Sequence, residues 1–153
     1  IGVRDTEIQR MGAAGGMAAC LVAFMGAEIE SGVDLVGKVL GLETQLIGAS
    51  LGSTAEGQID HSTKYDKLPV GIARLCKTRG IPIIALTGCL GDGYQTIYDY
   101  NIDEVVPIQD GPMSLDTSLE RTYELICDAT RRTVRLLKIG SAILPSTALR
   151  QTL

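Results

Sequence analysis

The residues of this chain that could do chemistry gather in one polar segment, residues 53–67. It supplies carboxylates, an ammonium group and hydroxyls, carried by Glu56, Asp60, Lys67, Thr54 and Thr63. Carboxylates can bind Mg²⁺ or accept a proton from a hydroxyl, and a lysine can stabilise charge on a transferring group. The segment could therefore contribute to phosphoryl transfer. A solvated loop whose charges face water would have the same composition.

The centre of this segment is expected to be a tight turn at Gly57, between Glu56 and Asp60. His61 is the chain's one histidine and could act as a base. A single histidine without an evident partner is more often simply exposed, so it is left out of the site.

Length, composition and net charge limit the class of protein and the partners that it can have. A chain of 153 residues with 45% hydrophobic and 21% charged residues is long enough for one ordinary core and belongs to the globular class. The net charge of −4, without a stripe of lysine and arginine, argues against nucleic acid or an anionic membrane as the main partner. A small anion could still bind backbone N–H groups locally.

The cysteines and the first apolar run give information about the cellular compartment of the protein. Cys20, Cys76, Cys89 and Cys127 form no C-x-x-C pair, which argues against a metal or disulfide framework and favours a reducing compartment, so we expect a cytoplasmic protein. The apolar run 11–29 resembles a signal-peptide core in part, but it meets Glu28 and is too short to span a bilayer.

The elements that must position the polar segment alternate between strands and helices. We predict a helix over 17–25, then two short helices over 33–40 and 42–47 broken at Gly41. The order then becomes strand 49–54, helix 69–79, strand 81–86, helix 94–100, strand 102–108 and a long last helix that Ser114 caps. This order predicts an α/β fold with a parallel sheet wrapped by helices.

Ligands of open parallel sheets bind beyond the carboxyl ends of the strands, where loops enter helices. Three unusual loops are predicted there, 53–67, 87–93 and 110–114. In the second, Gly88, Gly91 and Gly93 could present N–H groups to a phosphate, although they match neither the P-loop nor the Rossmann spacing. A tight turn with Asp92 as a helix cap is the equal alternative.

A series of motifs gives this pattern a family. The run Thr54-Ala55-Glu56-Gly57-Gln58-Ile59-Asp60, followed by Thr63, Lys67 and Pro69-Val70-Gly71-Ile72-Ala73, resembles a signature of bacterial D-glycerate kinases of the glucarate and glyoxylate pathways. Collinear segments at 12–16, 24–28, 33–36, 41–43, 88–93 and 110–115 are also similar to that family. The resemblance covers about residues 11–140 and concerns the family's C-terminal part.

The resemblance implies a kinase that moves the γ-phosphoryl group of ATP to D-glycerate with Mg²⁺, giving 2-phosphoglycerate in many members. It also implies a fold of two α/β domains with the site in their cleft. We expect residues 1–48 to be a mostly helical segment at the end of the second, inserted domain, 49–140 to be a Rossmann-like portion, and 141–153 to be a tail.

The resemblance supplies positions, and we assign roles to them as hypotheses. Asp60 would be a general base or Mg²⁺ ligand, Glu56 a Mg²⁺ or substrate ligand, and Lys67 a charge stabiliser. The substrate- or phosphate-binding set would be Thr54, Gly57, Thr63, Gly88, Gly91 and Gly93.

Departures from the family pattern limit these expectations. Ala55 stands where the family has glycine, Gln58 where it has arginine, Asp66 where it has glycine and Cys89 where it has serine. The family's N-terminal motifs are absent, so we expect the chain to be inactive by itself, with a missing N-terminal segment as its partner. The alternatives are a non-enzymatic α/β domain with weak anion or nucleotide binding, and a kinase for a different hydroxy acid.

Overall fold

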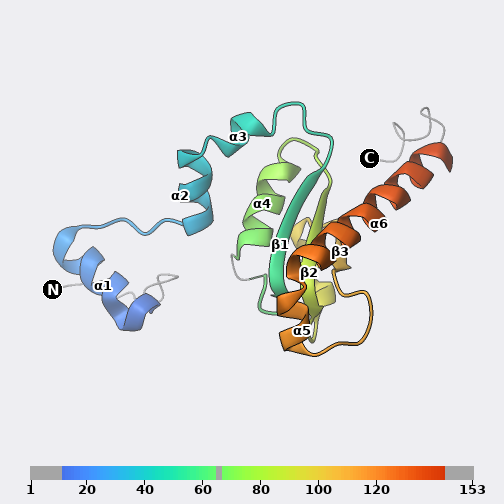
Figure 1. The fold of residues 1–153 in the computed structure, drawn as a ribbon. Helices are drawn as coiled ribbons and strands as arrows, with labels where there is room; N and C mark the ends of the chain where they lie inside the picture. The colour runs from blue at the N-terminus through green and yellow to red at the C-terminus, as the bar shows by residue number, and fades with distance from the viewer. Residues whose placement is uncertain (1–11, 65–66, 144–153) are drawn as a thin grey trace. The chain divides into compact units, whose positions relative to one another are not determined.

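The computed structural model describes residues 12–64 and 67–143, and the chain divides into two compact units at Gly41 (Figure 1). The first unit contains α1 (Ala13–Met25) and α2 (Gly32–Val39), and the second begins with α3 (Leu42–Gln45). The domain boundaries predicted from the sequence remain predictions. Most of the predicted tail lies outside the described residues.

Glycines end the helices of the first unit. Gly26 follows α1 with φ of 64°, and its N–H donates to the carbonyl of Val22 at 3.2 Å, as left-handed helix ends do. Gly41, with φ of 62°, separates α2 from α3. The predicted pair of short helices broken at Gly41 is therefore confirmed.

The second unit is built on a parallel sheet. Its strands are β1 (Gly52–Ile59), β2 (Ile83–Leu90) and β3 (Glu104–Pro107), in the order β1-β2-β3. β1 pairs with β2 in the register Gly52 opposite Ile83, and β2 pairs with β3. The predicted α/β fold with a parallel sheet and flanking helices is confirmed.

The first two strands run further than the sequence predicts. β1 continues to Ile59 and β2 to Leu90, so the predicted tight turn at Gly57 is wrong and Gly88 also lies in a strand. A Cβ atom on Gly88 would lie 2.6 Å from the carbonyl oxygen of Gly57. The absence of a side chain at Gly88 lets the backbone of β2 approach the Gly57 carbonyl of β1 closely, and the ladder bonds outweigh the weak strand preference of glycine.

One face of the sheet is covered by α4 (Leu68–Lys77) and by a 3₁₀ helix, η1 (Tyr94–Tyr100). α4 has Pro69 in its first turn, and Gly80 with φ of 65° follows its end, as predicted. The core on this face contains side chains with no exposed surface: Ile59, Ala73, Cys76, Ile83, Ala85 and Ile97.

The other face carries α5 (Leu115–Glu120) and α6 (Thr122–Ile143), which the sequence predicts as one helix (Figure 1). The hydroxyl of Ser114 accepts the N–H of Thr117 at 3.2 Å, so the predicted cap is confirmed. The helix breaks at Arg121, whose backbone leaves the helical region while its guanidinium binds Asp110 at 2.8 Å. None of the described helices is both long and apolar enough to cross a membrane.

Candidate functional site

The loops that follow β1 and β2 are tied directly to each other. The N–H of Gly91 donates to the carbonyl of Ile59 at 2.8 Å, and the N–H of His61 donates to the carbonyl of Asp92 at 3.0 Å. A Cβ atom on Gly91 would lie 2.8 Å from the Cβ of Asp60. Glycine at this position is therefore explained by packing between the two loops, and its predicted contact with phosphate remains a prediction.

The residues after β1 form a compact turn around Asp60. Its N–H donates to the Thr63 hydroxyl at 3.1 Å, and the N–H of Thr63 donates back to the Asp60 carbonyl at 3.0 Å. Oδ1 of Asp60 accepts both the N–H of Ser62 at 2.8 Å and its hydroxyl at 2.6 Å. Thr63 is fully buried. The structure thus brings the predicted Asp60 and Thr63 together, with Ser62 between them.

The hydrogen bonds from Ser62 stabilise the ionised form of Asp60. First the hydroxyl and then the N–H of Ser62 lower the pKa of the Asp60 carboxyl from its ordinary value, and the charge of Lys67 adds to this effect. The carboxylate is therefore harder to protonate than that of an ordinary aspartate. It is a weaker base than an ordinary aspartate and a good acceptor for a cation or a donor.

Lys67 enters the site at the beginning of α4. It occupies the position just before that helix, and its Nζ donates to the Ser62 hydroxyl at 3.1 Å. Asp60 and Lys67, seven positions apart, are thereby connected through one side chain. The sequence interpretation did not select Ser62. The available signal was the Asp-x-Ser spacing, in which an aspartate often accepts the N–H two residues on.

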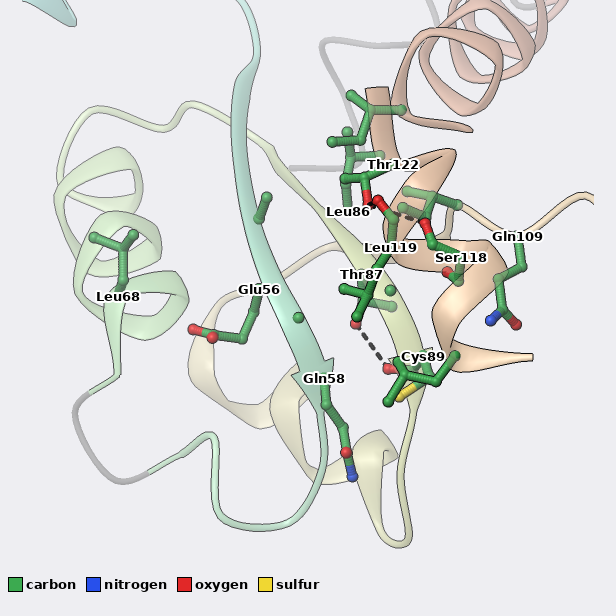
Figure 2. Close-up of a pocket in the computed structure, with 16 residues that line it drawn as sticks. Glu56, Gln58, Leu68, Leu86, Thr87, Cys89, Gln109, Ser118, Leu119 and Thr122 are labelled. Atoms are coloured by element: carbon green, nitrogen blue, oxygen red, sulfur yellow. Dashed lines mark hydrogen bonds between the residues drawn. The ribbon is translucent and has the colours of Figure 1, made fainter. Parts of the chain in front are cut away.

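A pocket of about 710 Å³ lies over the carboxyl-terminal halves of β1 and β2, against α5 and α6 (Figure 2). The strands contribute Gly57 and Gly88, both predicted site residues, and the helices contribute Ser118 and Thr122. The lining is mostly apolar with a few polar groups, which is common for small-molecule sites.

Glu56 also lines this pocket, from the edge of β1. In Figure 2 its carboxylate points toward the side where α4 begins at Leu68, away from Thr87 and Ser118 across the strand. No group of three metal-ligating residues occurs in residues 12–64 and 67–143. Glu56 and Asp60 would thus offer Mg²⁺ a limited set of carboxylates, not a full cage.

Two more predicted site residues, Thr54 and Gly93, do not line the pocket. Thr54 is buried in β1 opposite Ala85, whose side chain belongs to the core beneath α4, and it does not line the pocket. Gly93 lies in the loop after β2 with φ of 68°, close to the Cβ of His61.

Some polar residues of the pocket were not selected from the sequence. The Thr87 hydroxyl donates to the carbonyl of Cys89 at 2.7 Å, and the Thr122 hydroxyl lies 2.9 Å from the carbonyl of Ser118. Thr87 falls within the predicted glycine loop, and Ser118 follows the predicted loop at 110–114. Their predicted positions, close to loops that follow strands, were the signal that could have identified them as site residues. Neither belongs to a recognisable motif.

Fold and site together define a class of protein. The sheet is parallel, its polar loops meet at the carboxyl ends of the strands, and carboxylate, hydroxyl and ammonium groups lie in those loops. This is the arrangement of open α/β proteins, whose ligands bind at the carboxyl edge of the sheet.

The chain belongs to the Glycerate kinase family, whose model matches residues 2–138. It is 36% identical over 134 residues to the protein named glycerate 2-kinase in Escherichia coli (strain K12), a match that covers 88% of this chain. It is also 36% identical over 131 residues to a glycerate kinase of Halalkalibacterium halodurans, covering 86% of this chain.

A solved structure agrees with these matches. The crystal structure of a protein assigned as glycerate kinase 2 from Salmonella typhimurium LT2 superposes with a TM-score of 0.61 at 32% identity, covering 85% of this chain and 32% of the other. The chain spans about a third of the length of these proteins, 35% of the Escherichia coli relative and 34% of the Halalkalibacterium one.

Proposed function

We propose that this chain is the C-terminal portion of a glycerate kinase that transfers the γ-phosphoryl group of ATP to D-glycerate and gives 2-phosphoglycerate. The observation that carries the proposal is the row of Asp60, Ser62 and Lys67 after β1, in a chain of this family. The position of the transferred group follows the name of the Escherichia coli relative, glycerate 2-kinase.

Asp60 is proposed as a Mg²⁺ ligand in preference to a general base. Its Oδ1 accepts two hydrogen bonds from Ser62, whereas Oδ2 has, among the described residues, only a long contact with Gln58 Nε2 at 3.4 Å. The lowered pKa disfavours a role as general base, because a carboxylate that holds its proton weakly is a poor proton acceptor.

Glu56 is proposed as the second carboxylate of the site, for Mg²⁺ or for the substrate. Mg²⁺ in phosphoryl-transfer enzymes is held by one or two carboxylates together with phosphate oxygens and water, so the donors found in this chain fit that ion. When bound, the ion would neutralise charge on the nucleotide phosphates. Lys67 would stabilise negative charge on the transferring group.

The pocket is proposed to hold part of the small-molecule substrates. Its volume of about 710 Å³ lies within the range of small-molecule sites. Thr87, Gln109, Ser118 and Thr122 place polar atoms in a mostly apolar lining, where they could bind hydroxyl groups of the acid or the nucleotide.

The remaining part of the site is proposed to come from a preceding segment of the same protein, in the cytoplasm. Two features support this: β1 forms an edge of the described sheet, and two apolar residues are largely exposed, Leu119 of the pocket lining at 64% and Tyr123 at the beginning of α6 at 84%. Without that segment the chain is proposed to be inactive.

The test compares the 153-residue chain with the protein extended by the coding region upstream of Ile1. Both are mixed with ATP, Mg²⁺ and a panel of small hydroxy acids, and ADP and phosphorylated acid are measured. The extended protein should phosphorylate D-glycerate at position 2 and the chain alone should not.

Site variants complete this test. Asp60→Asn in the extended protein should lower kcat by at least about a hundredfold if the carboxylate holds the metal, whereas the matched surface variant Asp99→Asn should not. Turnover of a different acid would correct the substrate. An extended protein that binds ATP without any turnover would favour the non-enzymatic alternative.

A further inference from the structure

The side chain of Ser62 occupies a position that none of the proposed catalytic roles explains. Its hydroxyl lies 2.6 Å from Asp60 Oδ1 and 3.1 Å from Lys67 Nζ. A carboxylate only accepts hydrogen bonds and an ammonium group only donates them, so the direction of both bonds is fixed. Ser62 must donate to Asp60 and accept from Lys67.

Asp60 holds Ser62 at two points. Its Oδ1 binds the Ser62 hydroxyl and also the Ser62 N–H at 2.8 Å, and the backbone of the same turn is closed by the buried Thr63. Rotation of the Ser62 side chain would break one of these bonds. The acceptor lone pair that faces Lys67 is therefore fixed by the turn.

Lys67 has flexible methylene groups and would otherwise sample many positions at the surface. Among the described residues its ammonium makes one hydrogen bond, to Ser62, and no direct ion pair with Asp60. An ammonium group has three N–H donors, so two of them are left for a further acceptor. The neighbouring Leu68 lines the pocket, which places the site of this acceptor at the same end of the sheet.

We infer that Ser62 is a positioning residue: it holds the Lys67 ammonium through its hydroxyl and leaves two N–H donors for an anionic oxygen group of a ligand. The nature of that group, a phosphoryl oxygen or a substrate carboxylate, rests on the proposed function. The placement of Lys67 itself does not.

The first experiment observes Lys67 directly, in the 153-residue chain labelled with ¹⁵N-lysine. The Nζ signal is identified by its loss in Lys67→Met, and the exchange rate of its protons with water is measured by NMR. Ser62→Ala should speed exchange by roughly three- to tenfold, because it removes the hydrogen-bond acceptor. Ser62→Thr retains the hydroxyl and should restore slow exchange, and the exposed-serine control Ser50→Ala should change nothing.

The second experiment titrates inorganic phosphate and, separately, D-glycerate while the Lys67 signal is followed. Wild-type chain should respond to one of them, and Ser62→Ala should weaken that response by about five- to tenfold in Kd. A response to phosphate identifies a phosphoryl oxygen, and a response to glycerate alone identifies a carboxylate. Circular dichroism of each variant checks that the fold is retained.

The results separate the two proposals. Equal exchange rates in wild type and a folded Ser62→Ala chain would overturn the inference, as would a Lys67 signal that responds to neither anion. Absence of kinase activity in the extended protein would contradict the proposed function. It would not change what the two NMR measurements show about Ser62 and Lys67. If that protein does turn over glycerate, Ser62→Ala should lower kcat more than it raises KM, and Ser62→Thr should recover most of the loss.

Discussion

The two faces of the sheet differ in how completely the chain covers them. Under α4 and η1, Ile83, Ala85 and Ile97 have no exposed surface. On the opposite face, Ile108, Leu125 and Ala129 form a small buried cluster, and two hollows of about 710 and 820 Å³ open along α5 and α6. The covered face supplies stability, and the incompletely covered face leaves space for a ligand or for another part of the protein.

Neighbouring residues of β2 show the same contrast within one strand. Ile83 is fully buried in the cluster under α4, and Ile84 lines the larger hollow beside α6. Side chains of consecutive strand residues point to opposite faces. The strand therefore connects a well-packed core directly to an unfilled space.

The largest expected effect compares these two isoleucines. Ile83→Ala should lower the free energy of unfolding by about 4 kcal/mol, since it loses apolar burial and leaves a cavity. Ile84→Ala should cost about 2 kcal/mol, because its side chain already borders open space and only the transfer part is lost. Urea unfolding of both variants measures the difference. Equal losses would show that the α6 face is as well packed as the α4 face.

A second comparison concerns the facing glycines of β1 and β2. Gly88→Ala should destabilise the chain by about 1–3 kcal/mol, because the new Cβ would meet the Gly57 carbonyl oxygen at 2.6 Å. Gly57→Ala meets nothing within 4 Å and should be neutral or add about 0.5 kcal/mol. The same unfolding assay serves. A neutral Gly88→Ala would mean that the strands can separate at this point.

A third prediction concerns the exposed apolar residues of α5. Leu119→Lys should change the free energy of unfolding by less than about 0.5 kcal/mol, because Leu119 is 64% exposed. It should nevertheless reduce self-association of the chain on a sizing column, whereas the control Gln95→Lys on η1 should not. If both variants behave alike, added charge and not the α5 surface controls association.

The smallest expected effects are changes in the pKa values of two aspartates, Asp60 in the loop after β1 and Asp110 in the loop after β3. Hydrogen bonds from Ser62 lower the pKa of Asp60, and the Arg121 guanidinium lowers that of Asp110. Ser62→Ala should therefore raise the pKa of Asp60 alone, and Arg121→Gln that of Asp110 alone. Carboxyl ¹³C NMR titration measures both. A shift of both aspartates in either variant would show that the two loops are coupled.

The lowered pKa values of Asp60 and Asp110 also determine how the stability of the fold changes with pH. A carboxyl whose pKa is lower in the folded chain than in the unfolded chain stabilises the fold above its ordinary pKa. The contribution disappears as the pH falls through the folded-state value. Asp60 and Asp110 should thus make the chain less stable in acid, and the two variants should weaken that dependence.

The sequence predicted the order of elements and the parallel sheet, because apolar runs, Pro69, Gly80 and Ser114 are local signals. It was wrong about the ends of β1 and β2. Gly57 and Gly88 suggest turns locally, and only pairing between distant strands reveals that both lie in strands and that Gly88 lets the two backbones approach. The break between α5 and α6 falls at Arg121, which also contacts Asp110, and the residues around Arg121 carry no local signal for it.

For the candidate site too, the sequence reveals the residues with local signals and not those whose role depends on contacts between distant residues. Asp60, Glu56 and Lys67 have ionisable side chains in one segment and are found from sequence alone. The connecting role of Ser62 depends on a turn whose geometry is fixed by Asp60 and the buried Thr63. The wall formed by Ser118 and Thr122 depends on how α5 and α6 lie against the sheet.

β1 lies at the edge of the described sheet, and this has a consequence for the order of folding. A strand that extends the sheet in parallel at this edge must arrive through a crossover of a dozen or more residues. Such pairing joins distant parts of a chain and forms slowly, while the open edge can recruit wrong partners. In a longer protein that adds such a strand, this edge would be covered late in folding, and chaperone binding should be strongest before that pairing forms.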